Sequence, residues 1–287
     1  MQALLIFVVV LLGIFLPYGA PYTWLIRPSL MLMLFFAFLG MEFYKGVFRR
    51  DHFIILIFNL LLPILFYFGI RPFSETAALA AFMVGVAPTA AGAPVFADFL
   101  RTRVESVTAS VLLTSPIIAL LLPLLLSGLV KIEADIHFLE VLLPICMIIF
   151  IPLAASLLVK FTMKRQVPLI LKYKRVSFYL FLTNLYIAAS KASVFIRQDE
   201  TTSTTTIFSI AAAIAVLSIL NFGIGQRIGH QQWALANSLS LGRKNTMFAI
   251  WVSLTFINPA VALGPMFYIL AQNLYNGWQL YLVSSKK

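Results

Sequence analysis

Long runs of apolar residues, each bounded by charged residues or by Pro and Gly, fill almost the whole chain. A helix needs about 20 such residues to cross a bilayer. The runs are continuous and do not alternate between apolar and polar positions, which favours helices over strands. We therefore predict ten membrane-spanning helices, at residues 2–17, 24–41, 53–70, 75–99, 104–128, 138–160, 175–196, 204–225, 229–256 and 259–283.

Composition supports this prediction and excludes several classes of protein. Of the 287 residues, 61% are hydrophobic and 11% are charged, whereas soluble domains carry about 25% charged residues. Ten spans would use roughly 200 residues, which leaves no room for a separate globular or nucleic-acid-binding domain. We expect one integrated, all-α polytopic membrane domain, with one five-helix repeat in residues 1–130 and a second in residues 131–287.

Sequence motifs of intramembrane enzymes do not occur in this chain. It contains no His-Glu-x-x-His and no Gly-x-Ser-x-Gly segment, and its three histidines do not have metal-ligand spacing. The single cysteine, Cys146, lies in an apolar run and cannot form an internal disulfide. We therefore expect neither an enzyme nor a bound cofactor.

The distribution of basic residues predicts the orientation of the chain in the membrane. Of the 21 Lys and Arg residues, Arg243 and Lys244 fall inside the ninth predicted span, and fourteen lie on one side of the membrane. The other side carries the remaining five, which are Arg27, Arg71, Lys131, Lys191 and Arg197. Cytoplasmic loops collect Lys and Arg, so both termini are expected on the cytoplasmic side of a bacterial inner membrane.

Two of the predicted spans contain helix-breaking residues near their centres. The fourth span includes Pro88, Gly92 and Pro94, and an interior proline removes a backbone hydrogen bond and clashes with the preceding turn. The ninth span has a polar centre from Ser240 to Thr246. We expect the fourth span to unwind near residues 88–94 and the ninth span to be interrupted at its polar centre. The alternative is that the prolines only kink packed helices.

The positions of these two interruptions indicate a transporter. Each one is fourth in its group of five helices, and a repeat of five crossings has inverted topology because five is an odd number. An inverted repeat with one discontinuous helix in each half is typical of secondary transporters. The N-termini of half-helices expose unpaired N–H groups, which suit an anionic ligand.

The two interrupted segments also carry a resemblance to a known family. The stretches Val86-Ala87-Pro88-Thr89-Ala90-Ala91-Gly92-Ala93-Pro94 and Ala236-Asn237-Ser238-Leu239-Ser240-Leu241-Gly242-Arg243-Lys244-Asn245-Thr246 resemble the crossovers of the bile acid:sodium symporter family. Those crossovers read Pro-Gly-Gly-Thr-Ala-Ser-Asn and Glu-x-Gly-x-Gln-Asn-Ser, and Gly242, Asn245 and Thr246 are kept here. The resemblance implies two inverted five-helix repeats, a panel domain beside a core domain, and a substrate cavity near the crossing of the broken helices.

The sequence departs from this family where the resemblance assigns sodium ligands. Ser240 stands where sodium-coupled members have the glutamate that ligates both ions, and Lys244 stands at the family's glutamine. Ala93 and Pro94 align with the Ser-Asn pair that ligates sodium on the fourth helix. The lost carboxylate weakens the case for sodium coupling, and we predict no intact sodium site.

Further polar residues inside the predicted spans are candidates for lining a cavity. They lie on the third span, on the fifth span and before the interruption of the ninth span, and they are Asn59, Ser106, Thr108, Ser110, Asn237 and Ser238. Asn59 lies about where the family has a third-helix glutamine.

Lys244 and Arg243 place charge inside a predicted span, where each charge costs about 2.5–3.5 kcal/mol on insertion scales. We hypothesise that the Lys244 ammonium occupies the space that a sodium ion fills in relatives. Asp98 is the acidic candidate to pair with it, either structurally or as a pair that opens on protonation and couples transport to protons. Alternatively, Lys244 or Arg243 binds an anionic substrate, or Arg243 extends to an interface and Asp98 lies beside Arg101.

The sequence thus predicts a ten-helix secondary carrier for a small organic anion, either a carboxylate or a bile-acid-like amphipathic acid. It would work by alternating access between core and panel domains. A uniporter or proton-coupled carrier, and a non-transporting receptor built on the same fold, are the alternatives that the sequence leaves open. The lipid bilayer and a small organic anion are the partners that it implies, and nothing in it indicates an oligomeric state.

Overall fold

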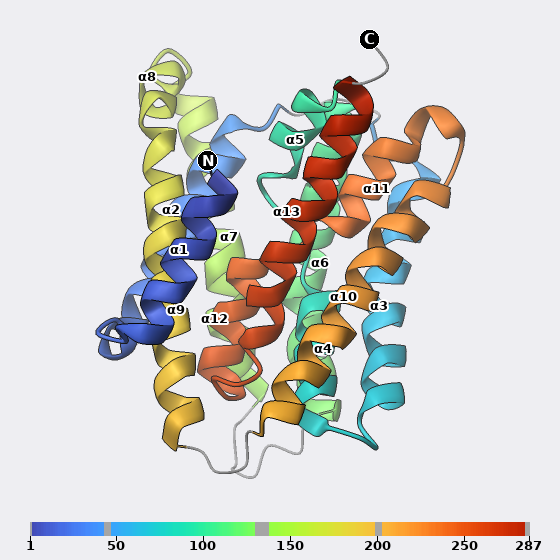
Figure 1. Cartoon of the computed structure of the whole chain (residues 1–287). Coiled ribbons are helices and arrows are strands. Elements are labelled where there is room, and N and C mark those ends of the chain that lie inside the picture. The colour runs from blue at the N-terminus through green and yellow to red at the C-terminus, as the bar shows by residue number, and fades with distance from the viewer. Residues whose placement is uncertain (1, 43–46, 130–137, 199–202, 285–287) are drawn as a thin grey trace.

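Apolar helices make up nearly all of the structure, a computed structural model that describes residues 2–42, 47–129, 138–198 and 203–284 (Figure 1). Within these ranges there are no strands. Six helical segments are long and apolar enough to cross a membrane, and they are Ala20–Gly40, Arg50–Ile70, Val104–Gly128, Phe138–Thr162, Val167–Gln198 and Thr204–Arg227. The chain is therefore an all-α integral membrane protein, as predicted.

The uninterrupted helices correspond in position to eight of the predicted spans. The first five are α1 (Gln2–Phe15), α2 (Ile26–Gly40) after a short turn η1 (Ala20–Leu25), α3 (Arg50–Ile70), α6 (Val104–Leu129) and α7 (Phe138–Thr162). The others are α9 (Val176–Gln198) after the short α8 (Val167–Leu171) and η2 (Lys172–Arg175), α10 (Thr204–Arg227) and α13 (Leu263–Ser284). The helices α3, α6 and α7 continue through the prolines inside them.

The fourth and ninth predicted spans are each divided into two helices, which confirms both interruptions. α4 (Glu75–Val86) and α5 (Ala93–Phe99) are separated by residues 87–92. α11 (Ala234–Gly242), which follows η3 (Gln231–Trp233), is separated from α12 (Thr246–Phe256) by residues 243–245. Pro94 lies in the first turn of α5, where proline is tolerated, so the unwound segment is shorter than the predicted 88–94.

The helices divide into two groups by their packing (Figure 1). In one group, α1 packs against α9, and α2 packs against both α7 and α9. In the other group, α4 packs against α3, α10 and α13, while α11 packs against α10, α6 and α3. α6 and α7 connect the groups. The interrupted helices therefore lie inside the second group, where α4 is buried from Ala77 to Val86.

Close helix contacts in the second group depend on glycine. A Cβ atom built at Gly225 on α10 would lie 2.6 Å from the carbonyl oxygen of Asn237 on α11. A Cβ atom at Gly264 on α13 would lie 2.8 Å from the carbonyl oxygen of Ala80 on α4. Small residues let helix backbones approach closely in membranes, so these glycines hold the interrupted helices against their neighbours.

We expect Gly225→Ala to lower the free energy of unfolding by about 1–3 kcal/mol, because the new methyl group meets backbone atoms that cannot move aside. Gly277→Ala on α13 is the matched control, since nothing lies within 4 Å of its Cβ position. Thermal unfolding of both purified variants in detergent measures the difference. Equal stability of the two variants would contradict the close contact.

Candidate functional site

The two interruptions meet inside the core and satisfy each other's backbone. Ala90 donates its N–H to the carbonyl oxygen of Arg243 at 2.8 Å. Asn245 donates its N–H to the carbonyl oxygen of Pro88 at 2.9 Å. Unwound backbone at membrane depth is tolerated only where its polar groups find partners. Each interruption supplies such partners to the other.

Thr89, in the first interruption, is fully buried and connects three segments of the chain. It pairs with Lys244 in an isolated antiparallel bridge. Its N–H donates to Oγ1 of Thr114 on α6 at 3.1 Å, and its hydroxyl donates to the carbonyl oxygen of Ser240 on α11 at 2.7 Å. One small polar residue thus fixes the crossing to two neighbouring helices.

Lys244 is almost completely buried, with 1% of its surface exposed. Its ammonium donates to Oδ1 of Asn59 on α3 and, at 2.7 Å, to the carbonyl oxygen of Gly85 on α4. Its backbone N–H donates to Oε1 of Gln272 on α13 at 3.2 Å. Neutral oxygens therefore hold the ammonium, and oxygen is also the ligand that hard metal cations take in proteins.

The expected pair between Lys244 and Asp98 does not form in this structure. Asp98 is exposed near the end of α5, whereas the ammonium is buried against Asn59 and Gly85. The structure shows salt bridges between Arg49 and Asp51, Arg71 and Glu75, and Arg103 and Glu105, and none of these three includes Lys244 or Asp98. The acidic partner expected from the sequence is thus replaced by an amide and a backbone carbonyl.

Arg243 is also buried, with 7% of its surface exposed, and does not extend to an interface. Its guanidinium carbon lies 3.5 Å from the ring centroid of Phe96 on α5, which is a cation–π arrangement. Nε and Nη1 of Arg243 have no hydrogen-bond partner. The two adjacent cations therefore have different environments, because the ammonium of Lys244 donates to two oxygens whereas Nε and Nη1 of Arg243 have no acceptor.

Gly242 ends α11 at a point where no side chain fits. A Cβ atom there would lie 2.2 Å from Cδ1 of Phe222 on α10. The carbonyl oxygen of Gly242 accepts a hydrogen bond from the Tyr268 hydroxyl at 2.7 Å, and that hydroxyl accepts one from Nδ2 of Asn221 at 3.2 Å. The freed carbonyl at the end of the half-helix is thus satisfied by α13.

Asn245 and Thr246 begin the second half of the interrupted ninth span. Oδ1 of Asn245 accepts a hydrogen bond from the N–H of Phe248 at 3.2 Å, which is an N-cap for α12. Part of the positive end of this half-helix is therefore satisfied within the chain. The sequence-based expectation of an open anion-binding N-terminus applies to α12 only in part.

A second buried polar cluster lies where α3 begins. Nε2 of His52 lies 3.0 Å from Oγ of Ser106. Asp51 accepts hydrogen bonds from Nδ2 of Asn237 at 3.2 Å and from Nη2 of Arg49 at 2.5 Å. Ser106 and Asn237, both predicted as cavity-lining residues, belong to this cluster instead of the crossing.

The remaining predicted hydroxyls have separate positions. Ser240 and Ser238 donate to backbone oxygens, of Ala236 on the same helix and of Phe222 on α10, both at 2.9 Å. Oγ of Ser110 is buried without a partner. These side chains do not form one ligand sphere.

The fourth-span residues aligned with sodium ligands contribute no side-chain oxygen. Ala93 and Pro94 are buried in α5, and Ala93 belongs to an apolar cluster that α5 shares with α6 and α11. Gly92 is exposed, and nothing lies within 4 Å of its Cβ position. In the described residues, no group of three or more His, Cys, Asp or Glu side chains has the arrangement of a metal site.

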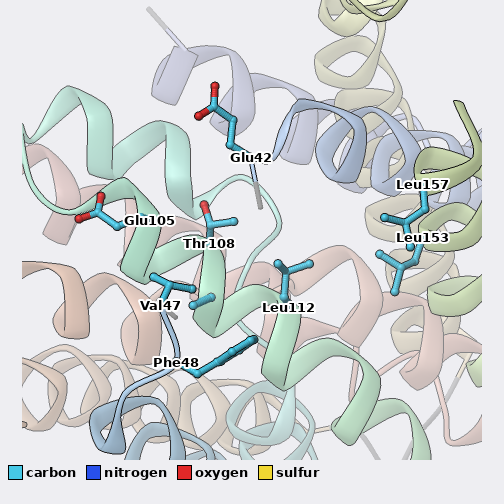
Figure 2. A pocket seen from close by; sticks show the side chains of 9 residues that line it. Glu42, Val47, Phe48, Glu105, Thr108, Leu112, Leu153 and Leu157 are labelled. Atoms are coloured by element: carbon cyan, nitrogen blue, oxygen red, sulfur yellow. The ribbon is translucent and has the colours of Figure 1, made fainter. Parts of the chain in front are cut away.

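An apolar cavity of about 260 Å³ lies between α6, α7 and the chain before α3 (Figure 2). Figure 2 shows Leu112 of α6 between Thr108 and the two leucines of α7. The cavity is lined by Glu42, Val47, Phe48, Glu105, Thr108, Ala109, Leu112, Leu153 and Leu157. It lies where the two helix groups meet, and of the predicted site residues it contains Thr108.

The structure thus brings several of the candidates together at the crossing, namely Asn59, Pro88, Ser240, Gly242, Arg243, Lys244 and Asn245. Asp98, Ser106, Thr108 and Asn237 lie apart from it. Sequence reasoning missed four polar residues that complete the crossing, which are Thr89, Thr114, Tyr268 and Gln272. For Thr89, the signal available in the sequence was its hydroxyl, directly after the first proline of the predicted interruption. For Tyr268 and Gln272, the signal was the spacing of the polar positions 268, 272, 276 and 279, which places them on one face of α13.

No protein-family profile matches this chain, and no curated protein matches it. Fold and site together define an all-α integral membrane protein in which two broken helices cross beside a buried lysine.

Thr89→Val should lower the free energy of unfolding by about 1–3 kcal/mol, because it leaves a buried carbonyl without its donor while the side-chain shape is kept. Thr205→Val, at an exposed position of α10, is the matched control. Thermal unfolding in detergent gives the comparison. A Thr89→Val variant as stable as the control would show that the hydroxyl does not fix the crossing.

Proposed function

We propose that this protein is a secondary transporter that moves a small organic anion by alternating access, without a coupling sodium ion. The observation that carries the proposal is the crossing of two broken helices around the buried, oxygen-bound ammonium of Lys244. Four features of the molecule support it.

The order of the helices supports a ten-helix inverted repeat. Lys244 lies 155 positions after Thr89 (244 minus 89), and these two residues pair at the crossing. Shifted by the same 155 positions, α2, α3, α4, α5 and α6 overlap α9, α10, α11, α12 and α13. Five crossings separate each helix from its equivalent, so the two halves have opposite orientations in the membrane. This arrangement is typical of secondary transporters.

The hydrogen bonds at the crossing follow the same shift. The shift of 155 positions takes Ala90 to Asn245 and Pro88 to Arg243, so it converts each of the two backbone hydrogen bonds between the interruptions into the other. The bond from the Thr89 hydroxyl to the carbonyl oxygen of Ser240 exchanges with the bond from the Lys244 ammonium to the carbonyl oxygen of Gly85. These exchanges support a two-fold axis through the crossing, as the resemblance to the bile acid:sodium symporter family implies.

The packing of the two helix groups supports a state open toward one side of the membrane. α1, α2, α7 and α9 correspond to the panel domain, and the other long helices correspond to the core domain. α12 packs against α2 and α9 of the panel, whereas α5, its equivalent, packs against α6 and α11 of the core. The apolar cavity is lined in part by the first turns of α6, the helix that follows α5 and packs against it. Alternating access would exchange these two arrangements.

The position of Lys244 supports transport that is independent of sodium. Its ammonium is bound by Asn59, which lies about where the related family has a third-helix glutamine, and by a carbonyl of α4. A covalently tethered cation cannot dissociate or travel with the substrate. The crossing therefore holds a basic group whose presence does not depend on a sodium gradient.

Reconstitution tests the transport activity directly. We expect purified protein in liposomes to exchange labelled carboxylates, with 2-hydroxypropanoate, propanoate and cholate as probes, at equal rates in sodium and potassium buffers. Binding of a probe without flux would identify a receptor on a carrier fold. Flux that requires sodium would contradict the tethered cation, and flux that follows a pH gradient would identify proton coupling.

Lys244→Gln removes the tethered cation and leaves an amide of similar length. We expect flux to fall by about tenfold or more, since the loss of one charge-assisted interaction is of that size. We also expect sodium to raise the thermal stability of this variant but not of the parent protein. Lys191→Gln is the control for a basic residue outside the crossing. Normal flux with unchanged stability in Lys244→Gln would overturn the role of the ammonium.

A further inference from the structure

Arg243 carries a buried positive charge that the protein itself does not neutralise. It has no acidic partner in the part of the chain that the structure describes, and its Nε and Nη1 atoms have no hydrogen-bond partner. The cation–π contact with Phe96 covers one face of the guanidinium and gives Nε and Nη1 no hydrogen-bond acceptor. Burial of a charged donor without a partner is strongly unfavourable. The free donors therefore indicate a site where an anion can bind.

Asn276 on α13 is a second buried group without partners. It is 1% exposed, and neither Oδ1 nor Nδ2 has a hydrogen-bond partner. The residue one turn before it, Gln272, accepts from the N–H of Lys244, and Gln279 donates to Oγ of Ser238 at 3.4 Å. Residues at this spacing share one face of a helix. Asn276 therefore faces the last turn of α11 and the interruption that follows it.

This face of α13 and the Phe96 ring under the Arg243 guanidinium approach the same apolar cluster. Phe96, which the guanidinium covers, and Leu280, one turn after Asn276, pack against the same small apolar cluster. Leu239 on the last turns of α11 is a buried member of that cluster. Arg243, through Phe96, and the face of α13 that holds Asn276, through Leu280, thus both lie beside the apolar cluster that α5, α6 and α11 share.

We propose that Arg243 and Asn276 form the binding site for the acid group of a small hydroxycarboxylate. The free donors, on Arg243 and at Nδ2 of Asn276, match the two oxygens of a carboxylate. A hydroxyl group beside the acid has one proton to donate, and one of the two free acceptors, Oδ1 of Asn276 or Oε1 of Gln279, accepts it. This assignment rests on the proposed function, since it identifies the class of anion that the carrier recognises.

The balance of donors and acceptors separates this class from other anions. A halide ion would occupy the donors and leave both buried acceptors without a proton to accept. A carboxylate without a hydroxyl would leave the same two atoms unsatisfied. Sites built to bind a substrate hydroxyl discriminate strongly against analogues that lack it, because buried polar groups are then left unpaired. The charge of a single carboxylate also offsets the charge of Arg243.

Ligand-dependent thermal unfolding of the purified protein in detergent tests the class. The probes are the potassium salts of 2-hydroxypropanoate, propanoate and chloride. Propanoate differs from 2-hydroxypropanoate by the loss of one hydroxyl group, and chloride has neither a hydroxyl nor a carboxylate group. We expect 2-hydroxypropanoate to stabilise the protein at a concentration about tenfold or more below that required for propanoate, and chloride to have no effect. Equal stabilisation by propanoate or by chloride would overturn the hydroxycarboxylate assignment.

Two variants test the residues. We expect Arg243→Gln to abolish the ligand-induced shift while the unliganded variant is at least as stable as the parent protein, because an unpaired buried charge has been removed. An arginine with a merely structural role would give a less stable protein. Asn276→Ala should weaken binding about tenfold, whereas Asn273→Ala, at a partly exposed position of the same helix, should leave it unchanged. A full ligand shift in Arg243→Gln or Asn276→Ala would overturn the site.

Flux measurements distinguish a failure of this site from a failure of the proposed function. Stabilisation that depends on Arg243, without flux in liposomes, would support the site and overturn the transporter. Flux of 2-hydroxypropanoate that is the same in Arg243→Gln and in the parent protein would overturn the site and support the transporter.

Discussion

Backbone N–H and C=O groups inside a bilayer must find partners within the protein, and this requirement governs the core of the molecule. Two interrupted helices would each expose unpaired groups if they stood alone. Placed against each other, they exchange backbone hydrogen bonds and pair Thr89 with Lys244. The close glycine contacts at residues 225, 242 and 264 follow from this, because the surrounding helices must approach the crossing closely enough to complete its hydrogen bonds.

The same low-dielectric surroundings make the two adjacent cations behave differently. Lys244 has a compact charge that an amide oxygen and a carbonyl can surround, so its burial is compensated within the chain. Arg243 has a planar group with five donors, of which the ring of Phe96 satisfies none by hydrogen bonding. The compact ammonium of Lys244 can be held by single oxygens from two helices, α3 and α4, whereas a guanidinium requires a planar acceptor. A carboxylate is such an acceptor.

Much of the helical architecture could be predicted from the sequence, and much of the site could not. Apolar runs locate the helices because each one must match the thickness of the bilayer, and Pro88 and the polar stretch around Gly242 locate the interruptions. The pairing of Lys244 was predicted with Asp98, because charge complementarity is the strongest signal in a sequence. It failed because a backbone carbonyl, that of Gly85, has no sequence signature and lies nearer. The hydrogen bond from Asn237 to Asp51 could not be predicted for a similar reason, since Asp51 comes from another helix.

The proposed two-fold repeat has symmetric backbone bonding and asymmetric chemistry. Under the 155-position shift, the counterpart of Lys244 is Thr89, and the counterpart of Arg243 is Pro88. Both charges therefore lie in the second half of the chain, while the first half contributes a hydroxyl and a proline at the same places. Inverted repeats need equivalent backbones to exchange two access states, but a binding site needs its charge only once. The symmetric crossing can thus supply the movement while the second repeat alone supplies the recognition of an anion.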